Sequence, residues 1–182
     1  MTATQLVTAE ELYQMGSDAP YELIEGVLKE VSPSSSKSSV IGMRIGSAVF
    51  SYVDVQSLGY VTGEGGGYIL SHDPATVVAP DVGFYRKDRY PGGVPDSGFY
   101  PLPPDLAVEV ISPSDRKSDI AQKQALYAKA GVPLVWWVDP ERRTVTVHRL
   151  GQDPEVVEAV GVLDGGDVLP GFTLELGTIF RD

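Results

Sequence analysis

The chain has 182 residues, 42% of them hydrophobic, and this length suits one domain built around one buried core. It contains no cysteine, which excludes disulfides and thiolate metal sites and leaves oxygen atoms and two histidines as metal ligands. The net charge of −11 weighs against a protein that binds nucleic acid mainly through phosphates, because that affinity depends on basic side chains.

Hydropathy predicts where the protein is located, and the distribution of charge predicts a locally positive surface. The N-terminus lacks the basic and apolar runs of a signal peptide, and no apolar run approaches the ~20 residues that span a bilayer. We therefore expect a cytoplasmic protein without membrane contacts. Most basic residues lie between positions 86 and 149. Five of them flank the carboxylates described below and predict a locally positive cleft, the alternative being solvated surface charges: Arg86, Lys87, Arg89, Arg116 and Lys117.

The first third of the chain predicts two helices and a hairpin. Thr8-Ala-Glu-Glu11 is a capping box that begins a short helix. Two short extended runs are joined by Glu25-Gly26, which predicts a β-hairpin. Beyond a serine-rich run, Ile41 and Ile45 begin a helical spacing of apolar residues, and we expect this helix to cover a sheet.

The rest of the chain predicts strands, one long loop and one helix. The glycine-rich run 63–67 predicts a hairpin turn, because it lacks the Gly-Lys-Ser/Thr ending of a phosphate-binding loop. Residues 90–104, rich in proline and glycine, predict a loop. The other predicted elements are strands at 81–85, 105–112, 134–138 and 144–149, and a helix at 115–130 capped by Ser112-Pro-Ser-Asp115. We expect one domain over residues 1–182, with a core at about 8–150 and an acidic extension at 151–182.

Two carboxylates stand beside or inside apolar strand-like runs. Glu109 interrupts the run 105–112, and Asp81 directly precedes the run 82–85. A lone buried carboxylate costs several kcal/mol unless a partner compensates it. Neighbouring strands that each present one carboxylate can share a hard cation, so this pair predicts a site for Mg²⁺ or Mn²⁺.

The predicted helix after Glu109 carries a lysine that can reach these carboxylates. Asp119, Lys123 and Tyr127 follow one another at intervals of four residues and share one helix face. A short connection keeps the first turns of this helix close to the end of the Glu109 strand. An ammonium there can stabilise negative charge on a phosphoryl group. The alternative is a surface pair of Asp119 with Lys123, and for Tyr127 a packing role at the wall of the site.

Other residues have simpler interpretations. His72 and His148 are isolated, and we expect surface or packing roles. Ser112 is interpreted as a helix cap and not as a nucleophile, because no histidine with a supporting carboxylate accompanies it. Trp136 and Trp137 point to opposite faces of a strand, so one fills the core and the other meets a helix or a second subunit.

The motifs together resemble the Uma2 family, a family of proposed endonucleases with the PD-(D/E)xK, or restriction endonuclease-like, fold. The resemblance covers about residues 8–150. It rests on these segments: Tyr21-Glu-Leu-Ile-Glu-Gly26, Pro80-Asp81, Glu109-Val-Ile-Ser-Pro113, Asp119 with Lys123 and Tyr127, Gly131-Val, and Trp137-Val-Asp-Pro140.

The resemblance implies an α/β fold in which helices flank a mixed β-sheet, preceded here by the N-terminal hairpin. It also implies a Mg²⁺ or Mn²⁺ site and hydrolysis of phosphodiester bonds in nucleic acid, with DNA as the expected partner. By this analogy Asp81 and Glu109 are metal ligands, the backbone carbonyl of Val110 is a further ligand, and Glu22 is a third acidic residue of the site.

Two positions depart from the family pattern. The motif lysine stands two residues after the glutamate, where this chain has Ile111, so Lys123 would substitute for it from the helix. Many relatives carry a histidine near the start of the preceding helix, where this chain has Ser38 and its neighbours.

Two alternative functions stay open at this point. The missing lysine and the acidic composition allow a nuclease fold retained as a binding or regulatory module. Paired carboxylates also occur in glycosidases, although that interpretation explains neither Lys123 nor the basic flanks. A homodimer is expected for a nuclease that cuts two strands.

Overall fold

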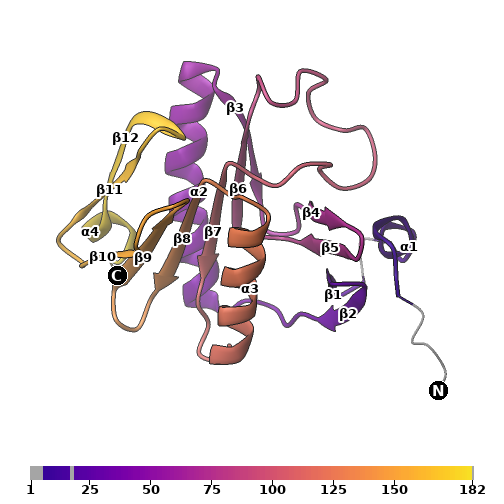
Figure 1. Cartoon of the computed structure of the whole chain (residues 1–182). Helices are drawn as coiled ribbons and strands as arrows, with labels where there is room; N and C mark the ends of the chain where they lie inside the picture. The colour runs from indigo at the N-terminus through magenta and orange to yellow at the C-terminus, as the bar shows by residue number, and fades with distance from the viewer. Residues whose placement is uncertain (1–5, 17–18, 182) are drawn as a thin grey trace.

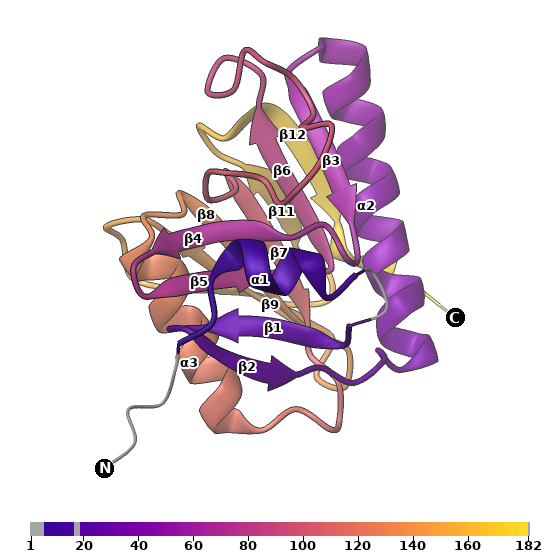
Figure 2. The same cartoon turned by 90° about the vertical axis from the view of Figure 1, so that its right-hand side faces the viewer.

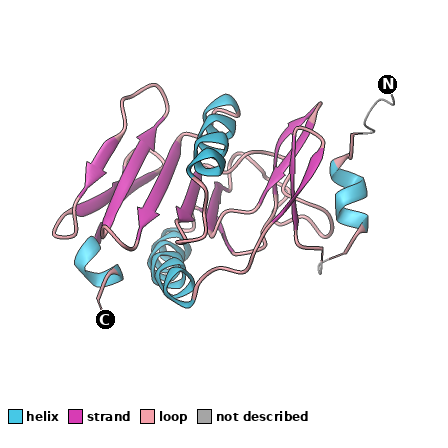
Figure 3. Cartoon of the chain, turned by 90° about the horizontal axis from the view of Figure 1, so that it is seen from below, coloured by secondary structure: helices cyan, strands magenta, loops and turns pink. Residues whose placement is uncertain are grey.

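A six-stranded mixed sheet forms the centre of the structure, a computed structural model that describes residues 6–16 and 19–181 (Figure 1). Its strand order is β10-β9-β8-β7-β6-β3, and only the β7–β8 pair is parallel. The strands are β3 (Gly59–Gly63), β6 (Val82–Arg86), β7 (Leu106–Val110), β8 (Leu134–Asp139), β9 (Thr144–Arg149) and β10 (Glu155–Val157). Helix α2 (Ser36–Gln56) covers one face and α3 (Lys117–Lys129) the other, as the view from below shows (Figure 3).

Helix α2 packs on the sheet through the predicted apolar face. Ser35 begins the helix by accepting a hydrogen bond from the N–H of Ser38, and Ser57 ends it with a φ of +53°. Ile41, Ile45 and Val49 are buried in the main core. The predicted helix and its covering role are therefore confirmed.

A smaller four-stranded sheet, β2-β1-β5-β4, lies between α1 and α3 (Figure 2). Its elements are α1 (Ala9–Gln14), β1 (Tyr21–Ile24), β2 (Val27–Glu30), β4 (Tyr68–His72) and β5 (Ala75–Val78). The capping box of Thr8 and Glu11 is present, and Glu25 and Gly26 both have positive φ, as a tight hairpin turn requires. The predicted helix and hairpin are confirmed.

The glycine-rich run 63–67 does not join two paired strands, so the predicted hairpin is wrong. Strand β3 before it pairs with β6 in the large sheet, whereas β4 after it pairs with β5 in the small sheet. A Cβ at Gly67 would lie 2.4 Å from the ring of Phe99. The glycines thus allow the chain to cross between sheets under the long loop at residues 90–104.

Residues 162–179 pack against the main core. They form β11 (Val162–Gly165), β12 (Leu169–Glu175) and α4 (Leu176–Ile179). Leu163, Phe172 and Ile179 are buried together with the inner face of α2. The segment that the sequence predicts as an acidic extension therefore contributes apolar side chains to the main core.

One local prediction differs from the structure and another agrees with it. The residue before helix α3 is Arg116, and its side chain makes no capping hydrogen bond, so the predicted cap by Ser112 is wrong. The Asp115 carboxylate instead accepts a hydrogen bond from the N–H of Ser112 at 2.8 Å. The prediction for the two tryptophans is confirmed: they face opposite sides of the sheet, Trp136 in the main core and Trp137 against Tyr127 of α3. Because both are buried, neither is available for a subunit interface. The expected class, helices flanking a mixed sheet with an N-terminal hairpin, is confirmed. Within the described residues no helix is both long and apolar enough to cross a membrane.

Candidate active site

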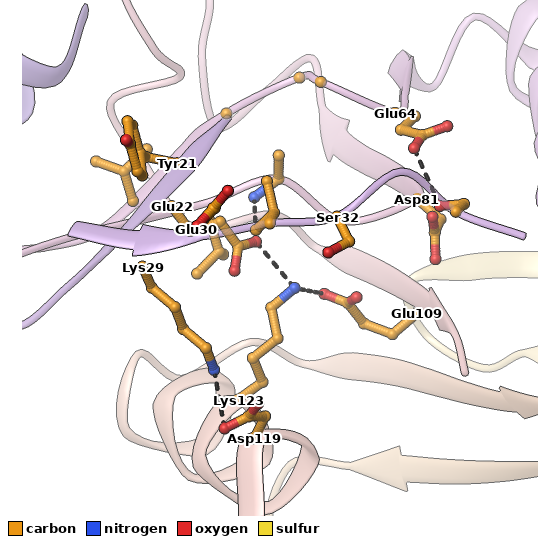
Figure 4. A pocket seen from close by; sticks show the side chains of 18 of the residues that line it. Tyr21, Glu22, Lys29, Glu30, Ser32, Glu64, Asp81, Glu109, Asp119 and Lys123 are labelled. Atoms are coloured by element: carbon orange, nitrogen blue, oxygen red, sulfur yellow. Dashed lines mark hydrogen bonds and ion pairs between the residues drawn. The ribbon is translucent and has the colours of Figure 1, made fainter. Parts of the chain in front are cut away.

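Lys123 joins three elements through two ion pairs. Its Nζ lies 2.9 Å from Oε1 of Glu22 on β1 and 2.9 Å from Oε1 of Glu109 on β7 (Figure 4). The exposed fractions of the three side chains are only 17%, 8% and 13%. The ammonium is therefore mostly buried between the hairpin, the central sheet and α3.

The surroundings of Lys123 favour its charged form. Burial alone lowers the pKa of Lys123, but the carboxylates of Glu109 and Glu22 outweigh burial, and the net pKa lies above its usual range. Burial raises the pKa of Glu109 to about 7, although Lys123 opposes this rise and Glu22 adds to it. Lys123 is thus a fixed positive charge beside carboxyl groups that are costly to ionise without it.

Tyr127 makes a further contact with Glu109. The Tyr127 hydroxyl donates a hydrogen bond to Oε1 of Glu109 at 2.5 Å. Burial and the adjacent Glu109 raise the pKa of Tyr127 well above its usual range, so the hydroxyl stays a donor. Lys123 and Tyr127 therefore both contact Oε1, and within the described part of the chain Oε2 accepts no hydrogen bond.

Asp81 lies beside the strand that carries Glu109. Asp81 directly precedes β6 in the chain. Its Oδ2 accepts a hydrogen bond from the N–H of Val110 at 2.6 Å. Burial raises the pKa of Asp81, while the Val110 N–H and the charge of Lys123 lower it. The antiparallel pairing of β6 with β7, Val82 opposite Val108, keeps this geometry. The structure thus brings Glu22, Asp81, Glu109 and Lys123 to one cavity.

The cavity has a volume of about 1290 Å³ and a predominantly acidic lining. The acidic side chains are Glu22, Glu30, Glu64, Asp81, Glu109, Asp115 and Asp119, and the basic ones are Lys29, Arg116 and Lys123. Of the five basic residues expected around a positive cleft only Arg116 lines it, so that prediction is wrong. Arg86 and Arg89 pair instead with Asp88 and Asp105, away from the cavity.

The same helix face makes a second contact with the hairpin. Asp119 pairs with Lys29 at 3.2 Å and not with Lys123, so the alternative of a surface pair within the helix is wrong. Figure 4 shows Lys29 directed to Asp119, and Lys123 directed to Glu22 and Glu109. Neither His72 nor His148 lines the cavity, in agreement with the roles expected for them.

The cavity offers oxygen atoms that a divalent ion could use as ligands. The Oε2 atom of Glu109, the Asp81 carboxylate and the Val110 carbonyl are oxygen donors of the kind that Mg²⁺ prefers. In the described part of the chain no three histidine, aspartate or glutamate side chains form a group that could hold a metal ion. The donor set therefore suits an ion held by one or two carboxylates and completed by water and a phosphate.

The sequence predicts only a packing role for Tyr127, but in the structure its hydroxyl contacts Glu109. This contact should contribute to the stability of the protein. Tyr127→Phe removes one donor from a buried carboxylate, and we expect the free energy of unfolding to fall by about 1.5–3 kcal/mol. Urea unfolding measures this change. Tyr52→Phe is the matched control, because its hydroxyl donates to the neutral carbonyl of Pro170, and we expect a loss of about 1 kcal/mol or less. An equal loss in both variants would contradict the role given to the Glu109 contact.

The mixed sheet, with acidic residues at two adjacent strands and a lysine on the covering helix, defines a restriction endonuclease-like protein. The family model Uma2, described as "Putative restriction endonuclease", matches residues 9–177. The chain therefore belongs to the Uma2 family, and the match extends beyond residue 150, where the resemblance was expected to end.

A solved structure has the same fold. It is the crystal structure of "a putative nuclease belonging to DUF820" from Anabaena variabilis, with a TM-score of 0.81 and 22% sequence identity. The similarity covers 96% of this chain and 97% of that chain. A search of curated proteins finds no match.

Proposed function

We propose that this protein is a Mg²⁺- or Mn²⁺-dependent endonuclease that hydrolyses phosphodiester bonds of nucleic acid, with DNA as the expected substrate. One observation carries the proposal: the ammonium of Lys123 lies 2.9 Å from Glu109 in the cavity that Asp81 also lines. Helix α3 thereby supplies the lysine that the chain lacks at Ile111. Membership of the Uma2 family supports the same reaction class.

The proposed roles follow from the contacts. Asp81, Glu109 and the carbonyl of Val110 would hold the ion, which when bound lowers the pKa of an attacking water and polarises the phosphate. The charge of Lys123 stabilises the negative charge that develops on the phosphoryl oxygens. Glu22 orients Lys123 through the second ion pair of the ammonium, in addition to the pair with Glu109.

The Val110 N–H and Tyr127 orient the two carboxylates. The first holds Oδ2 of Asp81, and the second holds Oε1 of Glu109, which leaves the other oxygen of each group available to a ligand. These groups need no rearrangement when a substrate arrives, because the side chains are already fixed by hydrogen bonds.

Cleavage assays test the proposal. We expect purified protein to cleave DNA with Mn²⁺ or Mg²⁺ and to stop when EDTA removes the ion. Supercoiled plasmid, linear duplex, single-stranded DNA and RNA serve as substrates, and gel electrophoresis measures the products. Absence of cleavage of every substrate with either ion would contradict the proposal.

A second candidate function is a binding or regulatory module with a nuclease fold. The acidic lining of the cavity and the isoleucine at position 111 favour it. Titration calorimetry with Mn²⁺ separates the two candidates. Absence of Mn²⁺ binding favours the module, whereas binding that is lost in Glu109→Ala favours the enzyme.

A further inference from the structure

The cavity continues from the ion pairs around the end of the four-stranded sheet. Successive side chains of β1 point to opposite faces, so Glu22 faces α3 while Leu23 packs under α1. The cavity is lined from both faces, by Lys123 on one side and by Tyr13 and Phe99 on the other. It therefore reaches from one face of the small sheet to the other.

Four aromatic residues line the part of the cavity away from Lys123. This aromatic wall consists of Tyr13 on α1, Tyr21 at the start of β1, and Phe99 and Tyr100 in the long loop. The exposed fractions of Tyr13 and Tyr21 are 40% and 39%. The Tyr13 ring stands edge-on to Phe99, with ring centroids 5.6 Å apart. Figure 4 shows Tyr21 at the end of the cavity opposite Asp81.

The charges of the lining disfavour a duplex held through its phosphates. Acidic side chains outnumber basic ones, and Lys29 and Lys123 are both paired with acids. Binding of duplex DNA depends on many phosphate contacts by free basic groups. Duplex DNA is also stiff over roughly 150 base pairs and would not bend around the end of a small sheet. An unpaired strand bends freely and gains affinity by stacking its bases on aromatic rings.

We propose that this cavity binds several linked unpaired nucleotides, with bases stacked on the aromatic wall and a phosphodiester farther along the same strand beside Asp81 and Glu109. This inference rests on the proposed function and names its substrate class. The volume of about 1290 Å³ exceeds the ~300–1,000 Å³ of small-ligand sites, as a site for several linked nucleotides requires.

Fluorescence anisotropy of the full chain in EDTA tests the proposal without cleavage. The probes are a labelled oligothymidylate, an oligouridylate and a duplex of equal length at one salt concentration. We expect at least one unpaired probe to bind more tightly than the duplex. Tyr13→Ala and Tyr21→Ala should each weaken that binding about tenfold, as loss of one base–aromatic stack predicts. Tyr13→Phe retains the ring and should recover most of the affinity.

Phe50→Ala is the control, because Phe50 is an exposed aromatic residue on α2 outside the cavity, and we expect no change in affinity. Duplex binding equal to or tighter than that of both unpaired probes would overturn the inference. Unchanged affinity in both tyrosine variants would also overturn it. Mn²⁺-dependent cleavage of duplex DNA without binding of either unpaired probe would reject this substrate class and keep the proposed endonuclease. Unpaired-strand binding that needs Tyr13 but accompanies no cleavage would reject the endonuclease and keep the base-stacking cavity.

Discussion

Asp81→Asn is expected to reduce Mn²⁺-dependent cleavage at least about 100-fold and to remove most Mn²⁺ binding. The substitution removes the negative charge but keeps an oxygen that can accept the hydrogen bond from the N–H of Val110. We therefore expect the fold to persist. Initial cleavage rates on plasmid DNA and titration calorimetry with Mn²⁺ measure the two effects, and thermal unfolding checks the fold.

Asp139→Asn is the matched control for this experiment. Its carboxylate also accepts hydrogen bonds from backbone N–H groups, those of Glu141 and Arg142, but it does not line the cavity. We expect its cleavage rate to stay close to that of the unsubstituted protein. Equal cleavage by Asp81→Asn and the unsubstituted protein would mean that another site or a contaminant cuts the DNA.

Part of the site could be predicted because its elements are joined by short connections. Helix α3 follows the Glu109 strand directly, and a helix in that position must lie near the end of the strand. The spacing of four residues then directs Lys123 and Tyr127 to the same side. The structure agrees with this geometry, since both side chains contact Oε1 of Glu109.

Contacts between distant segments could not be predicted from local patterns. The pair of Lys29 and Asp119 depends on how the hairpin packs against α3, and no short-range spacing relates these residues. The glycine-rich run likewise predicts a turn, but long-range contacts decide which strands pair on either side of it. Local sequence therefore predicts where helices and strands lie in the chain better than it predicts which of them contact one another.

The prediction of a positive cleft failed because it inferred distances in space from distances in the sequence. Asp81 precedes β6 and Arg86 ends it, so at about 3.3 Å per residue the Cα atoms of the two residues are roughly 16 Å apart. Proximity in the sequence thus overstates proximity in space along a strand. Arg86 and Arg89 neutralise Asp88 and Asp105 at that far end.

Lys123→Met should lower the free energy of unfolding by about 3–5 kcal/mol, because it leaves two nearly buried carboxylates without their cation. Such a loss is a large part of the ~5–15 kcal/mol that stabilises a typical domain. Methionine keeps most of the volume of the lysine stem, so the effect reports the charge. Urea unfolding measures it, and cleavage is then compared at temperatures where both proteins are folded, where we expect a further loss of about 100-fold.

Lys129→Met on the same helix separates this effect from a general change in α3. Its ion pair with Glu25 is solvent-exposed, with side chains 69% and 53% accessible, and such pairs contribute about 0–1 kcal/mol. The double variant Lys123→Met with Glu22→Gln should recover part of the lost stability, because one unpaired buried charge is removed. Equal stability losses for Lys123→Met and Lys129→Met, without recovery in the double variant, would contradict a buried ion-pair centre. A stability loss without any loss of cleavage would limit Lys123 to holding the hairpin, the central strand and α3 together.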